Sequence, residues 1–195
     1  MRDLHILFAK LGAEVGSNPL KKHIKAPILT AQMTEEQKRL WHKIKNFEID
    51  DIDASFTFSD RLARENDWSI EYALRTILEY KKFIFLIAVS DYPQTPSDQI
   101  DQVWHLHLLY TESYWIELCT NTIQKQIHHG PTKGSEERTL FKEQYVKTLD
   151  LYASIFNEKP PNDIWLDVDT RFSDIHFTRV NRKRNWIIPK PRFKN

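Results

Sequence analysis

The sequence contains one cysteine, Cys119, among its 195 residues, so no disulfide bond can form within the chain. Unpaired cysteines are typical of proteins in reducing compartments. Residues 1–5 also lack the charged and apolar pattern of a secretory signal peptide. We therefore expect a cytoplasmic protein.

Long apolar runs are absent as well. The longest covers residues 83–89 and is much shorter than the roughly 20 residues that a membrane-spanning helix needs. A hydrophobic content of 41%, with 12% aromatic residues, instead fits a globular chain with a full core. We expect residues 83–89 to lie in that core, and we expect no membrane partner.

The motifs of several common enzyme classes are missing. The chain has no nucleophile elbow, phosphate-binding loop, dinucleotide-binding fingerprint or paired-cysteine zinc motif. The sequence therefore leaves open whether the protein is an enzyme, and it specifies no catalytic residue, substrate or protein partner.

Hydrophobic periodicity and capping residues predict an all-α fold. Thr34 and Gln37 form a capping box before one amphipathic helix, and residues 58–66 form a short second helix. Ser69 caps a long helix that continues through residue 89. The continuous helical pattern leading into residues 83–89 favours a central helix over a buried strand.

Two further helices follow in the sequence. Thr95 and Pro96 supply the cap and the first position of the fourth helix. Ser135 caps the last helix, which we expect to end at Pro160 and to continue as an extended segment through Trp165. The sequence thus predicts a single-domain helical bundle over residues 34–168. An irregular N-terminal arm, residues 1–33, with a candidate helix over residues 4–11, precedes it, and an extended basic tail, residues 169–195, follows it.

Four of the eight histidines lie between residues 101 and 132, so binding or chemistry is expected there. On a regular helix Asp101 and His105 share one face because they are four residues apart, whereas His107 points to the opposite side. Asp101 and His105 can therefore bind one ligand together, but His105 and His107 cannot. We expect His107 to pack among apolar side chains and Cys119 to be a small core residue.

The chain after this helix can supply further ligands. Gly130 and Pro131 favour a reversal that would return His128 and His129 to the helix. A regular helix reaching Cys119 would carry the chain about 27 Å along its axis, so the return requires an early helix end. The candidate site comprises Asp101, His105, His128, His129 and Glu79, of which the first four are candidate ligands of a divalent metal ion.

The candidate site has two interpretations. The pair of Asp101 and His105 is either a functional site, in which a carboxylate orients an imidazole, or a buried polar pair that stabilises the fold. Glu79 lies in an apolar stretch of sequence, so it either faces solvent or is a third polar partner of the pair.

One combination of motifs is distinctive, namely Trp104-His105-Leu106-His107 followed by Tyr114, Cys119 and His128-His129-Gly130-Pro131. Flanking matches extend to Phe58, Trp68, residues 79–83 and residues 160–165. Over residues 56–168 the chain resembles the glycine-rich domain-containing protein-like family, a largely uncharacterised group from bacteria and plants. Because the whole chain contains four glycines, it resembles the helical domain without the glycine-rich region. The resemblance implies no particular reaction.

A basic tail supports a different function. Residues 171–195 contain eight Lys or Arg and one Asp, a net charge of +7 in a chain whose total is +1. Cations that alternate with aromatic residues are typical of phosphate and base contacts in nucleic-acid binding. The candidate contacts are Arg179, Arg182, Lys183, Arg184 and Trp186. Three functions thus remain open: a metal-dependent or acid/base enzyme, a non-enzymatic protein-interaction module, and nucleic-acid binding through the tail.

Overall fold

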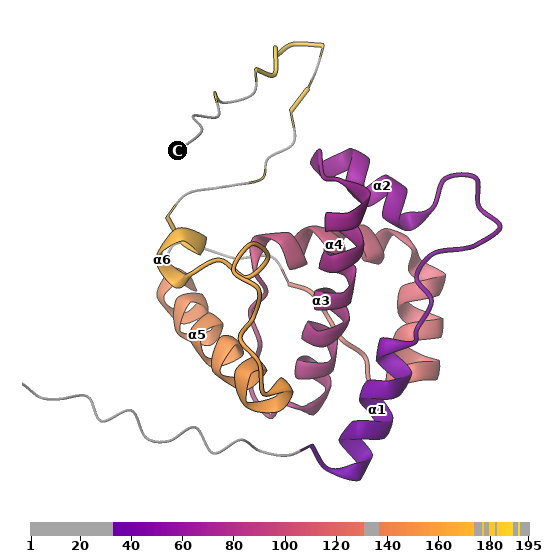
Figure 1. Ribbon diagram of the computed structural model, residues 1–195, viewed down its shortest axis with the longest axis vertical. Helices are drawn as coiled ribbons and strands as arrows, with labels where there is room; N and C mark the ends of the chain where they lie inside the picture. Colours follow the sequence, from indigo (N-terminus) through magenta and orange to yellow (C-terminus); the bar gives the residue numbers. More distant parts are fainter. Residues whose placement is uncertain are drawn as a thin grey trace, which may run out of the picture.

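A computed structural model of the chain describes residues 33–130, 137–173, 177, 180–181, 183–188 and 191. Within this part the regular elements are all helices (Figure 1): α1 Glu35–Lys45, α2 Phe58–Asn66, α3 Ile70–Val89, α4 Asp98–Leu109, the π-helix η1 Glu112–Ile123, α5 Glu137–Phe156 and α6 Val168–Arg171. The predicted all-α single-domain bundle is confirmed. The N-terminal arm up to residue 32, with its candidate helix, lies outside the described residues, as do residues 131–136.

Local hydrogen bonds fix the starts of the first three helices. Thr34 Oγ1 accepts from the backbone N–H of Gln37 at 3.1 Å, and Gln37 Oε1 accepts from the N–H of Thr34 at 2.9 Å, which confirms the capping box. Thr57 and Asp60 form the same arrangement at α2. Ser69 Oγ caps α3 by accepting at 3.2 Å from an N–H of its first turn. Each cap contributes about 1 kcal/mol because it satisfies an N–H group that has no partner inside the helix.

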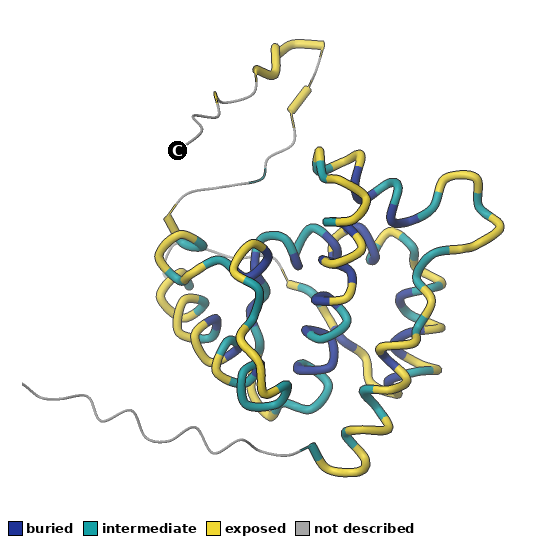
Figure 2. The backbone as a smooth tube through the Cα atoms, viewed as in Figure 1, coloured by how far each residue is buried: buried dark blue, intermediate teal, exposed yellow. Residues whose placement is uncertain are grey.

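The central element of the bundle is α3, which contacts α1, α2, α4 and α5 (Figure 1). Phe83, Ile84, Phe85 and Leu86 are each at most 1% exposed, and Figure 2 shows this buried stretch in the middle of the molecule. Fully burying a side chain of this size contributes about 1.5–3 kcal/mol. The predicted core position of residues 83–89 is therefore confirmed, with residues 87–89 half-buried at its edge.

The start of α4 differs in detail from the prediction. The helix cap is Ser97, whose Oγ accepts from the N–H of Ile100 at 3.3 Å, and not Thr95. Thr95 is buried, and its backbone N–H donates to Thr148 Oγ1 of α5 at 3.1 Å. Thr95 therefore joins two helices, a role that depends on a residue far away in the sequence.

The α-helix that carries Asp101 and His105 ends before Cys119, as the predicted return of the loop requires. α4 ends at Leu109, Tyr110 leaves the helical region with φ −89° and ψ 68°, and the chain continues as η1. The ring of Tyr110 lies edge-on against Phe58 of α2, with 5.2 Å between centroids, and this contact holds Tyr110 at the break. The contact joins distant segments, so periodicity within residues 98–123 could not reveal it.

Side-chain hydroxyl groups stabilise the wide turns of η1. Thr120 Oγ1 donates to the carbonyl oxygen of Trp115 at 2.8 Å, and Thr122 Oγ1 donates to that of Glu117 at 2.7 Å. Both bonds reach five residues back, which is the spacing of a π-helix. Because a π-helix does not advance 100° per residue, the face that Asp101 and His105 share on α4 does not continue regularly along η1.

The region after α5 also differs from the prediction. α5 ends at Phe156, where Asn157 adopts a left-handed φ of 52°, so the helix stops before Pro160. The predicted extended segment is a turn instead, since the N–H of Trp165 donates to the carbonyl oxygen of Pro161 at 2.8 Å. The short helix α6 follows and was not predicted.

Candidate metal centre

Asp101, His105 and His129 come together near the start of α4. His129 Nε2 lies 2.7 Å from Asp101 Oδ1, and His105 Nδ1 lies 3.6 Å from Asp101 Oδ2. The two imidazole rings are 4.6 Å apart between centroids, and one ligand atom from each of the three residues lies within 4.8 Å of the others. Two imidazoles and a carboxylate at this spacing could hold a metal ion.

α4 positions two of these three side chains. Asp101 and His105 lie four residues apart in a regular α-helix and so face the same side, as the sequence predicts. Asp101 belongs to the first turn of α4, where the positive end of the helix dipole favours a negative charge. The carboxylate is therefore well placed to act as a ligand.

His129 reaches the site because two aromatic side chains hold the returning chain. Trp104 Nε1 donates to Tyr114 Oη at 2.9 Å, and Tyr114 Oη donates to the carbonyl oxygen of Ile127 at 2.6 Å. These residues are buried, so water does not compete for the bonds. The ring of His129 then lies against that of Trp104, with 4.3 Å between centroids. The predicted return of the loop to α4 is confirmed for His129.

The cluster lies at the edge of the bundle and is open on one side. The side chains of His129 and Asp101 are 16% and 22% exposed, whereas that of His105 is 53% exposed. An ion bound here would have protein on one side and solvent on the side of His105. Three protein ligands with an accessible fourth position are the arrangement of catalytic zinc sites, whereas structural sites are closed by four ligands.

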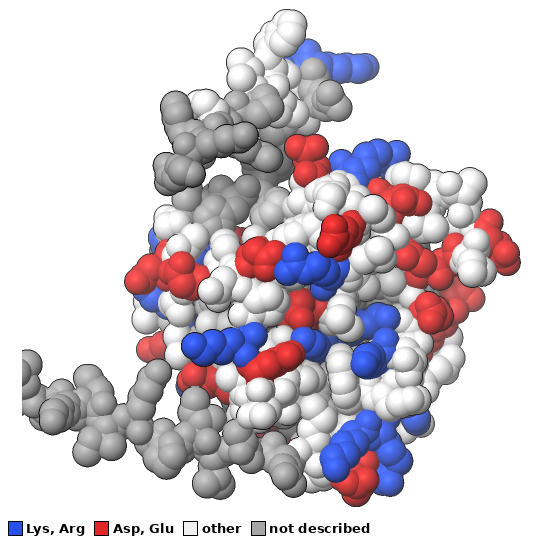
Figure 3. Space-filling view, viewed as in Figure 1, with Lys and Arg blue, Asp and Glu red and all other residues white. Residues whose placement is uncertain are grey.

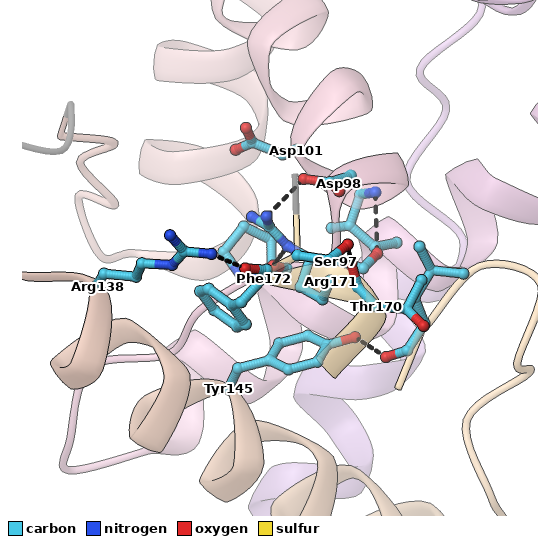
Figure 4. Close-up of polar contacts among 12 residues, drawn as sticks. Ser97, Asp98, Asp101, Arg138, Tyr145, Thr170, Arg171 and Phe172 are labelled. Atoms are coloured by element: carbon cyan, nitrogen blue, oxygen red, sulfur yellow. Dashed lines mark hydrogen bonds and ion pairs between the residues drawn. The ribbon is translucent and has the colours of Figure 1, made fainter. Parts of the chain in front are cut away.

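An ion pair supports the first turn of α4 beside this cluster. Arg171 Nη1 lies 2.6 Å from Asp98 Oδ1, and Arg171 Nε donates to the carbonyl oxygen of Pro96 at 3.3 Å. Figure 4 shows Asp98 and Asp101 on the same stretch of helix, with Arg171 and Phe172 below them. The carboxylate of Asp98 is thus engaged by α6, whereas that of Asp101 faces the two histidines.

Two other candidate residues lie elsewhere. His128 is exposed, and its ring contacts that of Trp115 at 5.4 Å between centroids, outside the cluster. Glu79 is buried in α3, where its Oε1 lies 2.8 Å from Lys82 Nζ and its Oε2 accepts from Trp165 Nε1 at 2.9 Å. Neither predicted role of Glu79 matches this placement, because its carboxylate neither faces solvent nor belongs to the histidine cluster.

His107 and Cys119 are core residues, as predicted. His107 is fully buried, with Tyr80 Oη 2.9 Å from its Nδ1 and Ser113 Oγ 3.3 Å from its Nε2. Burial lowers the pKa of His107 to about 3, so its ring is neutral near neutral pH. Burial also raises the pKa of the Cys119 thiol, which disfavours the reactive thiolate. His105 and His107 therefore occupy different environments, as their helix positions predict.

The described part of the basic tail is exposed. Lys183, Arg184 and Trp186 all face solvent, whereas Arg179 and Arg182 lie outside the described residues. Exposed cations beside an exposed indole are compatible with nucleic-acid contacts, and that function stays a prediction.

Two features of this region were not predicted from the sequence. One is the hydrogen-bonded connection from Trp104 through Tyr114 to Ile127, for which the only signal is the density of aromatic residues around the histidines. The other is a cleft of about 660 Å³ between the α1–α2 connection and the start of η1. Both depend on the break after α4, which periodicity does not indicate.

Comparisons with protein-family models, curated proteins and solved structures gave no match to this chain. The resemblance to the glycine-rich domain-containing protein-like family therefore stays an expectation. None of the helices in the described part is both long and apolar enough to span a membrane.

Proposed function

We propose that this protein binds a divalent transition-metal ion through Asp101, His105 and His129. The observation that supports this most strongly is the convergence of one ligand atom from each residue within 4.8 Å. Ligands held about 2.0–2.1 Å from a tetrahedral zinc ion stand roughly 3.3 Å apart. The distance of 2.7 Å from Asp101 Oδ1 to His129 Nε2 and that of 3.6 Å from Asp101 Oδ2 to His105 Nδ1 lie on either side of that value, and separations of up to 4.8 Å within the set would shorten on binding.

The donor set favours particular metals and a particular chemistry. Two imidazoles and one carboxylate suit zinc or iron(II) better than calcium or magnesium, which prefer oxygen ligands. The open side at His105 would leave a position for water or a substrate oxygen. A bound divalent cation lowers the pKa of such a water toward neutrality or polarises the substrate oxygen. We therefore infer metal-assisted hydrolysis or acid/base catalysis as the activity class.

The contact between His129 Nε2 and Asp101 Oδ1 favours a second function if no ion binds. At 2.7 Å the two atoms can share a proton directly, and the pair would then hold the returning loop against α4. In that case the domain would be a non-enzymatic interaction module, and the loop that includes His128 would be the surface it presents.

Elemental analysis of the untagged protein distinguishes these functions. We expect about one zinc, iron or manganese ion per chain, and saturation of the metal-free protein by one equivalent of Co²⁺ in its visible absorption. Loss of a residue that merely orients a ligand typically costs about 10–100-fold in metal affinity. Asp101→Asn and His129→Asn remove ligands, so each should weaken binding by more than that.

His128→Asn is the matched control, because it removes an adjacent, exposed histidine that lies outside the cluster. It should bind the metal as the wild type does. Equal affinities of the His128→Asn and His129→Asn variants would contradict the proposed site. A protein that neither contains nor binds these metals, yet unfolds more easily after His129→Asn, would support the interaction module.

A further inference from the structure

The cleft at the start of η1 combines an apolar wall with a rim of one charge. It has a volume of about 660 Å³ and shares no lining residue with the proposed metal site. Its apolar wall is formed by Ile49, Phe56, Phe58 and Tyr110, and its carboxylates belong to Glu48, Asp50, Asp51, Glu112 and Glu117. The lining residues, all within the described part of the chain, include no Lys or Arg. Acidic side chains gather at the right-hand edge of the molecule, over the α1–α2 connection (Figure 3).

The C-terminal segment of residues 183–188 has the complementary composition. Trp186, Ile187 and Ile188 are 96%, 61% and 84% exposed, an unusual position for three consecutive large apolar side chains. Lys183 and Arg184 precede them and are also exposed. Burying a tryptophan alone removes about 150–250 Å² of surface from water, so this segment gains much by docking.

A local turn presents this segment in a defined way. The backbone carbonyl oxygen of Asn181 accepts hydrogen bonds from the backbone N–H groups of Arg184 and Asn185, both at 3.0 Å. Residues 185–188 that follow are not helical. In an extended backbone Trp186 and Ile188 point to the same side, so both can meet one apolar wall.

The segment leaves its own bundle at a ring contact. Phe177 lies edge-on against Trp68, with 6.2 Å between centroids, next to the end of α2. Beyond it the described residues 183–188 lie away from the body of the molecule (Figures 1 and 2). Within the described part of the chain their apolar side chains therefore have no partner surface, and a neighbouring molecule can supply one.

We propose that residues 183–188 dock into the acidic cleft of a second copy of this chain. Trp186 and Ile188 would pack against Phe56 and Tyr110. Lys183 and Arg184 would face the carboxylates of η1.

The charges of the two parts of the chain match this arrangement. Residues 171–195 carry +7 and the remaining residues carry −6 within a total of +1, so tail and body attract between molecules. If each molecule donates its segment to the other, the contact is reciprocal and closes as a two-fold dimer.

A charge-reversal exchange in the full-length protein tests this contact. Glu112→Lys with Glu117→Lys reverses the two charges on η1 that would face the segment, and Lys183→Glu with Arg184→Glu makes the segment acidic. Each double variant alone should dimerise at least about tenfold more weakly than the wild type, because like charges then face each other. An equimolar mixture should regain the dimer, because residues 112 and 117 of each molecule then face a segment of opposite charge.

Sedimentation equilibrium over a range of protein concentrations measures these constants, with and without chelator, so the result does not depend on metal binding. Glu143→Lys with Asp150→Lys is the matched control, since both acids are exposed on α5 and neither lines the cleft. Trp186→Ala should also weaken the dimer, because it removes an apolar contact without changing any charge.

Three results would overturn the proposal. A monomer at all concentrations excludes the second copy, and protection of Trp186 from a collisional quencher in that monomer would assign the cleft to its own tail. A dimer that is insensitive to both charge reversals uses another surface. Saturable quenching of Trp186 by single-stranded nucleic acid, without a dimer, would assign the segment to nucleic acid.

Discussion

Tyr114 Oη donates to the carbonyl oxygen of Ile127 across 2.6 Å, and this bond fixes the chain two residues before His129. The same oxygen accepts the indole N–H of Trp104, against which the ring of His129 lies. One buried hydroxyl group thus connects α4, η1 and the returning loop. Tyr114 therefore determines where His129, the third candidate ligand, lies, although Tyr114 is not itself part of the candidate ion site.

Removing this hydroxyl should weaken metal binding without removing a ligand. Tyr114→Phe leaves the indole N–H of Trp104 and the carbonyl of Ile127 without their partner, which costs about 1–3 kcal/mol for each buried group left unsatisfied. We expect a lower melting temperature and a metal affinity reduced by about 10–100-fold, as for other groups that orient ligands. Calorimetric titration of the metal-free protein measures the affinity, and thermal unfolding measures the melting temperature. Tyr92→Phe, at an exposed tyrosine, is the control and should change neither quantity.

Stability should fall on mild acidification because of His107. Its pKa is about 3 in the folded protein, below the value of about 6.5 in the unfolded chain, so between these values the unfolded state binds more protons. The contribution of the neutral ring is complete above pH 6.5 and is lost as the pH falls toward 3. From pH 7.5 to pH 5 the loss amounts to about 2 kcal/mol.

Urea unfolding of the wild type and of His107→Gln at both pH values isolates this contribution. The variant should be less stable at pH 7.5, because Tyr80 and Ser113 lose well-placed partners, but its stability should depend less on pH. Equal pH dependence in the two proteins would show that another group is responsible.

Glu79 should matter for folding and not for the metal. Its carboxylate joins Lys82 and Trp165 in the core, so Glu79→Ala breaks a buried pair and leaves the indole N–H unsatisfied. Loss of one member of a buried pair costs about 3–5 kcal/mol, and the second carboxylate on Lys82, from Glu158 at 2.6 Å, should keep the loss near the lower end. Metal affinity should remain unchanged. A variant with wild-type stability and impaired metal binding would restore Glu79 to the candidate site.

The thiol of Cys119 should be unreactive while the protein is folded. It is fully buried and its pKa is raised by burial, so little thiolate forms and reagents cannot reach it. Because the chain has one cysteine, a thiol-specific chromogenic reagent reports on this residue alone. Labelling at pH 8 should be slow in buffer and rapid in denaturant. Fast labelling of the native protein would show that η1 opens readily.

The parts of the fold that sequence predicted are those determined by neighbouring residues. Thr34 and Ser69 cap their helices through N–H groups three positions away, and the shared face of Asp101 and His105 follows from regular helix geometry. Tyr110, at the break, instead contacts Phe58, which is distant in the sequence, so this contact leaves no local signal.

The candidate site was predictable only as a region. Adjacent residues of a non-helical chain point to opposite sides, so only one of His128 and His129 can face α4, and the choice depends on where Ile127 is held. That position is set by Tyr114, which lies on a π-helix that a 100° periodicity does not describe. The sequence therefore indicated both histidines, and the structure brings His129 alone to the pair on α4.

The chain between His105 and His129 contains the whole of η1, so an ion bound by both residues would close that stretch into a ring. Any opening that separates η1 and the loop from α4 would then have to break the contact of His105 or His129 with the ion. With metal at 100 times its dissociation constant, the same opening would require about 2.7 kcal/mol more, because the ion must first leave. Amide exchange in η1 and proteolytic cleavage within it would then slow by about 100-fold. The concentration of available metal would therefore determine how fast residues 105–129 are cleaved.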